Sequence, residues 1–131
     1  MKSLAHAARI STALGVLALG SAGLTGTAAA ASTPFEVCSP LGCAVQSVRG
    51  TVEKSGGQTR VVATIADSSP TASLTARFIL TGKTTEAWQV IVDDATRQVL
   101  LNSAAAPTRL TVSACATGGG IGGCSTKTVP L

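Results

Sequence analysis

A two-residue alternation of apolar and polar side chains constrains the fold of this chain more than any other sequence feature. The clearest instance covers residues 72–80, where one set of positions is apolar throughout: Ala72, Leu74, Ala76, Phe78 and Leu80. The positions between them include Ser73, Thr75 and Arg77. Successive side chains point to opposite faces of a strand, whereas one face of a helix repeats every three to four residues. The segment is therefore predicted to be a half-buried β-strand.

Shorter segments repeat the same period and are separated by turn residues. The further predicted strands cover residues 48–53, 61–65, 88–92, 110–114 and 125–129. The predicted turns are Ser55-Gly56-Gly57-Gln58, Asp67-Ser68-Ser69-Pro70 and Thr81-Gly82-Lys83-Thr84. After Asp93-Asp94 a hairpin into a strand over residues 97–102 is preferred, and a short helix over 94–106, capped by Asp94, is the alternative.

Short strands that follow one another so closely predict an all-β fold, a small immunoglobulin-like β-sandwich with two local disulfides. The cysteine–tryptophan–cysteine spacing of antibody domains is absent. Phe35, Phe78 and Trp88 are the only aromatic residues, so the core is built mainly from small side chains. A small domain with such a core depends on covalent staples for part of its stability.

The first 31 residues have the pattern of a secretory signal peptide. Lys2 and Arg9 give a basic start, residues 10–24 are apolar, and Ala28-Ala29-Ala30-Ala31 offers cleavage after Ala30 or Ala31. A membrane anchor is the weaker alternative, because the apolar run is shorter than the roughly 20 residues that span a bilayer. The protein is therefore predicted to be secreted and extracellular, with an extended N-terminal arm at 32–44 and the sandwich domain at 45–131.

All four cysteines lie in the mature part, and an oxidising compartment favours two disulfides. Three pairings are possible in principle. The spacing favours Cys38–Cys43 and Cys115–Cys124, since each pair brackets a turn. A zinc site is the alternative, but the only histidine, His6, falls in the signal peptide.

The mature part lacks the residues that most catalytic chemistry needs. Without histidine, a serine nucleophile would have no imidazole base, and the chain contains no S-x-x-K motif. Residues 118–123 match G-x-G-x-x-G, but only eight residues follow, too few for a dinucleotide-binding unit, so a flexible hairpin tip is predicted. Asp93 and Asp94 are interpreted as turn residues. We therefore expect no enzyme activity, no cofactor and no metal site.

The basic residues of the mature part are scattered singly along the chain. They are Arg49, Lys54, Arg60, Arg77, Lys83, Arg97, Arg109 and Lys127. Eight basic residues stand against six acidic ones, and aromatic residues are few. This distribution predicts solvated outer-face positions rather than a nucleic-acid-binding face or insertion into a membrane.

The alanine-rich export signal, the small domain rich in Thr, Val, Gly and Ala, and the two tight cysteine pairs resemble secreted proteins of actinomycetes. Three groups share this outline: enediyne chromoprotein apoproteins, subtilisin-inhibitor-type proteins, and the adaptor subunits of umbrella toxin particles. The first group implies a carrier of a small aromatic molecule, the second a protease inhibitor. The third implies an exported domain that joins a lectin-bearing subunit to a toxin subunit.

The residues rank these three functions. A carrier needs stacking surfaces for its ligand, and three aromatic residues supply few. An inhibitor needs a rigid exposed loop, which Gly118–Gly123 cannot form. An adaptor needs only a stable sandwich, an arm and an open sheet edge. The leading hypothesis is thus a non-catalytic protein-interaction module that binds larger secreted protein subunits; the carrier and the inhibitor are the alternatives.

Overall fold

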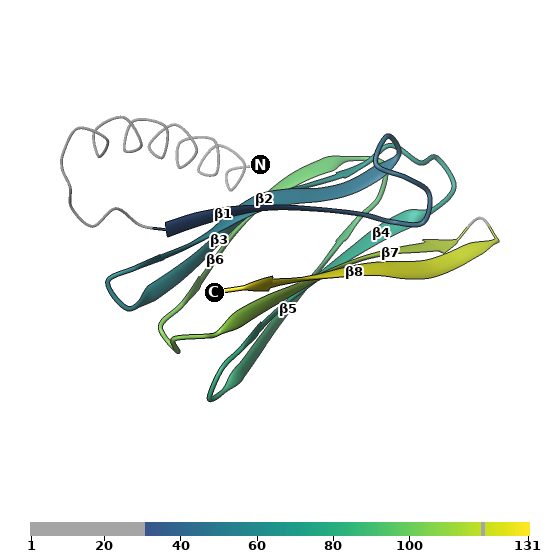
Figure 1. Cartoon of the computed structure of the whole chain (residues 1–131). Helices are drawn as coiled ribbons and strands as arrows, with labels where there is room; N and C mark the ends of the chain where they lie inside the picture. The colour runs from purple at the N-terminus through teal and green to yellow at the C-terminus, as the bar shows by residue number, and fades with distance from the viewer. Residues whose placement is uncertain (1–30, 119) are drawn as a thin grey trace, which may run out of the picture.

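Eight antiparallel strands form two four-stranded sheets in the computed structural model, which describes residues 31–118 and 120–131 (Figure 1). The strands are β1 (Ala31–Cys38), β2 (Gln46–Ser55), β3 (Gln58–Asp67), β4 (Ser73–Thr81), β5 (Thr85–Val92), β6 (Thr96–Ser103), β7 (Arg109–Gly118) and β8 (Ile121–Pro130). The first sheet has the order β1-β2-β3-β6 and the second the order β5-β4-β7-β8. The predicted all-β sandwich is confirmed. The predicted signal peptide lies outside the described residues, except for Ala31.

The apolar residues that alternate with polar ones in the sequence are the buried residues in the structure. Every second residue of β4 from Leu74 to Leu80 is buried, and β3 and β7 show the same pattern. The inner faces of both sheets meet in one core, in which Phe78, Ile65 and Leu74 are completely buried. Valines and alanines occupy most of the other inner positions, and Phe35 and Phe78 are the only buried aromatic residues in the described part of the chain.

The strand after Asp94 forms as predicted, but the predicted hairpin with the preceding strand is wrong, and so is the alternative helix. Strand β6 leaves the sheet that contains β5 and pairs with β3 of the other sheet, placing Val99 opposite Ala63. This crossing buries Leu101 against the core instead of exposing it beside β5. With β1 set aside, the orders β2-β3-β6 and β5-β4-β7-β8 are immunoglobulin-like.

The predicted N-terminal arm is not separate from the sandwich, which corrects the boundary drawn at residue 45. Residues 31–38 are extended as expected, but they form edge strand β1 and pair with β2 over their whole length. Phe35 and Val37 are buried in the common core. These two apolar side chains, two residues apart, supply the reason that the segment joins the sheet.

The Phe35 ring covers the one glycine in the interior of β2. Gly50 pairs with Phe35 on one side and with Ala63 on the other. A Cβ at Gly50 would overlap the carbonyl oxygen of Val62 and lie 2.9 Å from Phe35 Cζ. The absence of a side chain at this position therefore lets β1 and β3 approach β2 closely.

No helix in the described residues is long and apolar enough to cross a membrane.

Candidate functional site: the braced end of the sandwich

Four connections between strands lie together at one end of the sandwich, on the right in Figure 1. They are residues 39–45, 68–72 and 93–95 together with Gly118 and Ile121, the paired residues at the ends of β7 and β8, and we call them the braced end. Loops gathered at one end of a β-sandwich often carry its binding function, because the sheets hold them in fixed relative positions. Both disulfides and most of the buried polar side chains lie at or beside this end.

The β1–β2 connection is closed by the disulfide Cys38–Cys43, as predicted. Gly42 donates its backbone N–H to the carbonyl of Ser39 at 2.8 Å, and its own carbonyl accepts from the N–H groups of Val45 and Gln46. Gly42 has a φ of 98°, a left-handed conformation that favours glycine. The ring is therefore fixed by a covalent bond and by its own backbone hydrogen bonds.

A buried polar network ties this ring to the rest of the braced end. Gln46 is completely buried at the start of β2. Its side-chain oxygen accepts a hydrogen bond from Ser39 Oγ at 2.6 Å, and its Nε2 donates to Asp67 Oδ1 at 3.0 Å. Nε2 also lies 3.4 Å from the carbonyl of Ala72, at the start of β4. One amide side chain thus links the first connection to the second.

Asp67, at the end of β3, is the centre of the network. Its Oδ1 also accepts from the backbone N–H of Ser69 at 2.9 Å, and its Oδ2 accepts from the N–H of Asp94 at 3.2 Å. Its own N–H donates to the carbonyl of Ala95 at 2.8 Å. The carboxylate, only 3% exposed, therefore holds the 68–72 and 93–95 connections in place from one point.

Ser69 completes the 68–72 connection. Its Oγ accepts from the backbone N–H groups of Thr71 at 3.3 Å and of Ala72 at 3.0 Å. Ser68 donates its N–H to the carbonyl of Val45 in the first connection at 2.9 Å. Backbone groups that would otherwise face solvent at a loop are in this way paired within the braced end.

The second disulfide, Cys115–Cys124, joins two residues that lie directly opposite each other on β7 and β8. It braces the hairpin whose tip was expected to be flexible. Pro40 of the ring packs beside this hairpin, since a Cβ at Gly123 would lie 3.4 Å from Pro40 Cγ. The two disulfides, far apart in sequence, thus stabilise neighbouring parts of one surface.

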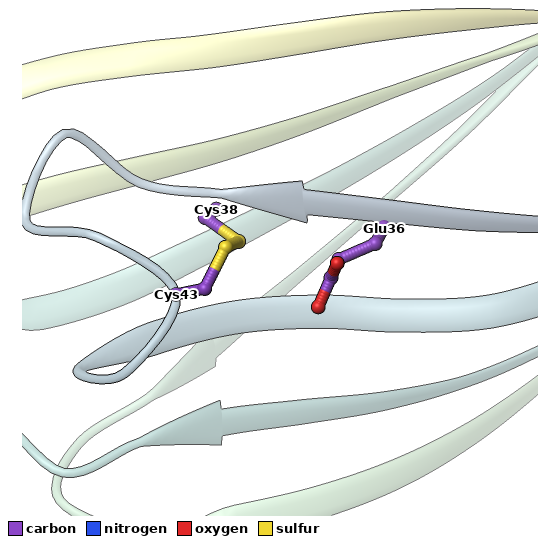
Figure 2. A group of neighbouring side chains, drawn as sticks. All are labelled: Glu36, Cys38 and Cys43. Atoms are coloured by element: carbon purple, nitrogen blue, oxygen red, sulfur yellow. A yellow bond between two sulfur atoms is a disulfide. The ribbon is translucent and has the colours of Figure 1, made fainter.

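A carboxylate oxygen of Glu36 and the Sγ atoms of Cys38 and Cys43 all lie within 4.8 Å of one another, close enough to bind one metal ion (Figure 2). Both sulfur atoms are joined in the disulfide, which removes the thiolates that would bind zinc. The Glu36 carboxylate pairs with Arg49 Nε at 2.5 Å on the outer face of the sheet. The donor set of this cluster therefore does not fit a metal ion.

The other motifs singled out in the sequence lie in turns, in a hairpin and on exposed strand positions. Gly118 ends β7 and residues 121–123 begin β8, so the described part of the 118–123 motif joins two strands rather than a strand and a helix; residue 119 lies outside the described residues. Asp93 and Asp94 are exposed turn residues, as predicted, and Asp94 has a φ of 49°. The basic residues predicted on outer faces are exposed, except that Arg60 is half-buried. The outer-face prediction is wrong for Arg97, which lies opposite Ile65 on the inner side of edge strand β6.

Sequence reasoning missed Gln46 and Asp67, the two residues on which the network depends. The order Asp67-Ser68-Ser69 does carry a signal, since aspartate often accepts a hydrogen bond from the N–H two residues later in a turn. Nothing local marks Gln46, whose partners lie 7, 21 and 26 residues away.

The outward surface of the braced end is small, rigid and largely uncharged. Its exposed residues include Pro40, Ala44, Ser68, Pro70 and Thr71, with Asp93 and Asp94 at one side. Such a surface can bind without first ordering its loops, which lowers the entropy lost on association. The chain matches no protein family model, no curated protein and no solved structure.

Proposed function

We propose that this chain is a secreted, non-catalytic protein-interaction module whose braced end binds a larger secreted protein. The observation that carries the proposal is the buried network of Ser39, Gln46 and Asp67, which together with Cys38–Cys43 fixes three separate connections on one exposed surface. Buried polar networks of this kind stabilise one loop geometry rather than several. Preformed loops on a rigid scaffold are a common design for protein recognition.

The extracellular setting rests on the signal pattern of residues 1–31 together with the disulfides. Two disulfides, such as this domain contains, are typical of extracellular proteins. Within that setting, the resemblance in outline to adaptor subunits of umbrella toxin particles favours a role in joining subunits of an extracellular toxin complex. The absence of histidine from residues 32–131 supports a binding rather than a catalytic role.

The structure shows that the N-terminal segment is part of the folded domain, so the binding residues should be tested at the braced end and not by deleting this segment. An arm that could be removed without loss of the fold is no longer a suitable test, because Phe35 and Val37 of β1 belong to the core. Substitutions should instead alter exposed positions of the braced end. Ala44 and Thr71 are exposed and lie in different connections.

The test is co-purification of the tagged chain from culture supernatant. We expect one or more larger secreted proteins in a fixed ratio to the wild-type chain, and loss of this association in the double variant Ala44→Arg/Thr71→Arg. Gln58→Arg, at the exposed turn on the opposite end, is the matched control and should bind like the wild type. Equal thermal unfolding of all three chains would show that the sandwich is intact.

Two results would contradict the proposal. One is association that survives the double variant or is lost equally in the control. The other is purification of the chain alone with a coloured or ultraviolet-absorbing small molecule, which would favour the carrier function.

A further inference from the structure

Strand β5 is an edge strand without proline, without glycine and without an exposed charged side chain. It pairs only with β4, over eight residues that include neither proline nor glycine. Its single charged residue, Glu86, makes a hydrogen bond with Ser103 Oγ of β6 and so faces the inside of the sandwich. Natural sheets usually protect such an edge with proline, a bulge or charged side chains, including charges that point inward. Glu86 is the one inward charge on β5, but it is half-buried and bonded to Ser103, whereas a charge that protects an edge is exposed.

The other three edges are protected or disrupted. Strand β1 has Pro34 at its middle, and β8 has two glycines near its start and Pro130 at its end. Strand β1 also packs against β7 and β8 of the second sheet. On β6, Arg97 faces the same side as Val99 and is exposed, so a cation stands at the inner face of that edge.

The exposure of Ile91 indicates that β5 can bind a further strand. It lies on the outer face of the sheet with 57% of its surface exposed, and it is the one large hydrophobic residue so exposed in the described part of the chain. On the inner face of the same strand, Trp88 and Val90 are only partly buried against the core. Another strand beside β5 would cover all three side chains.

The sequence of β5 is complementary to itself when two copies run antiparallel with Gln89 at the centre. Ile91 then lies opposite Ala87 of the second copy, and Trp88 lies opposite Val90 of the second copy. These pairs join apolar residues on the outer and on the inner face, and no two like charges meet. Gln89 accepts a hydrogen bond from Arg77 at 3.1 Å, which leaves its amide N–H groups free to donate across the axis.

Charges at the two ends of β5 favour the same arrangement. Lys83 lies just before the strand, and Asp93 and Asp94 lie just after it; all three are exposed. Antiparallel pairing places Lys83 of each copy beside the acidic pair of the other, so the attraction occurs twice. Parallel pairing would instead place like charges together at both ends.

We propose that the chain forms a two-fold symmetric homodimer through β5, in which two four-stranded sheets become one eight-stranded antiparallel sheet. A two-fold contact of this kind is isologous, with the same strand contributed by each copy. The braced end lies at the C-terminal end of β5 and next to it, and antiparallel pairing turns the two braced ends in opposite directions. The dimer goes beyond the proposed function. It uses Asp93 and Asp94 at one side of the braced end and leaves the exposed residues Pro40, Ala44 and Thr71 accessible in both copies.

The test is the mass of the oxidised chain in solution, measured by sedimentation velocity and by light scattering over a dilution series. We expect the mass of two chains at high concentration and dissociation on dilution. Ile91→Lys and Gln89→Lys should shift the midpoint of dissociation to at least about tenfold higher concentration, since each places a cation in the paired edge. Lys54→Glu, an exposed charge change away from β5, is the control and should leave the midpoint unchanged.

A charge exchange tests the antiparallel arrangement itself. Lys83→Glu alone should weaken the dimer, and the combination of Lys83→Glu with Asp93→Lys and Asp94→Lys should restore it. A wild-type chain that stays monomeric at all concentrations would overturn the proposal, as would a dimer that is unaffected by Ile91→Lys and Gln89→Lys. Failure of the charge exchange to restore the dimer would overturn the antiparallel pairing. A monomer that still captures a secreted partner would reject the dimer and leave the proposed function supported.

Discussion

Replacing Asp67 by alanine tests whether the braced end depends on one buried carboxylate. The substitution removes both oxygens that accept hydrogen bonds from Gln46 Nε2, from the N–H of Ser69 and from the N–H of Asp94. The first two donors are buried. The N–H of Asp94 lies nearer the surface and can reach solvent.

The magnitude follows from these two buried donors. A hydrogen bond to a charged group contributes about 1.5–3 kcal/mol, and a buried donor left unpaired costs about 1–3 kcal/mol. We therefore expect Asp67→Ala to lower the free energy of unfolding by about 3–5 kcal/mol. In a domain of this size that corresponds to a decrease in Tm of roughly 12–40 °C. Since small domains have only about 5–15 kcal/mol in total, the variant should be close to unfolding at 37 °C.

Urea titration monitored by Trp88 fluorescence measures this change. The midpoint should fall while the m-value stays constant, because the surface exposed on unfolding is nearly the same. Ser68→Ala is the matched control: its hydroxyl donates to the Val45 carbonyl from an exposed position, so we expect a loss of at most about 1 kcal/mol. If Asp67→Ala is as stable as this control, the carboxylate does not hold the connections together and the reasoning is refuted.

Two further predictions concern the sheet and the export of the chain. Gly50→Ala should lower the free energy of unfolding by about 1–3 kcal/mol, because the new methyl group overlaps the Val62 carbonyl and the Phe35 ring; Gly122→Ala, where a Cβ meets no atom within 4 Å, is the control in the same urea titration and should change stability little. Mass spectrometry of the secreted chain without reduction should show Ala31 or Ser32 as the first residue and the loss of four protons, and an uncleaved chain would contradict the predicted signal peptide.

The sequence predicted those features of the fold that depend on neighbouring residues. The alternation from Ala72 to Leu80 identified both the strand and its buried face, because the pleat alone decides which side chains share a face. The two disulfides were also predictable, since each cysteine pair brackets a short connection. In both cases the information lies within about ten residues of chain.

Features that depend on pairing between distant residues were not predictable in the same way. The pattern of residues 97–102 identified a strand but not its neighbour, and the choice between β5 and β3 is decided by the two-sheet arrangement. Likewise, Gln46 is a polar residue at the start of a strand, where exposure is the ordinary expectation. Its burial is tolerated only because Ser39 and Asp67 satisfy its side chain from other parts of the chain.

The braced end and the β5 edge differ in a way that suits two separate contacts. Backbone and side-chain polar groups at the braced end are bound to one another, so this surface offers shape and fixed loops rather than unpaired donors and acceptors. The β5 edge is the reverse, since its outward N–H and C=O groups have no neighbour in the sheet and would bind any strand of suitable sequence. Self-pairing of β5 occupies this edge with the one strand that is always present at the same concentration. In the proposed dimer this pairing protects the chain from pairing with unrelated strands, and the two braced ends, facing opposite directions, remain the surfaces that we propose to bind larger subunits.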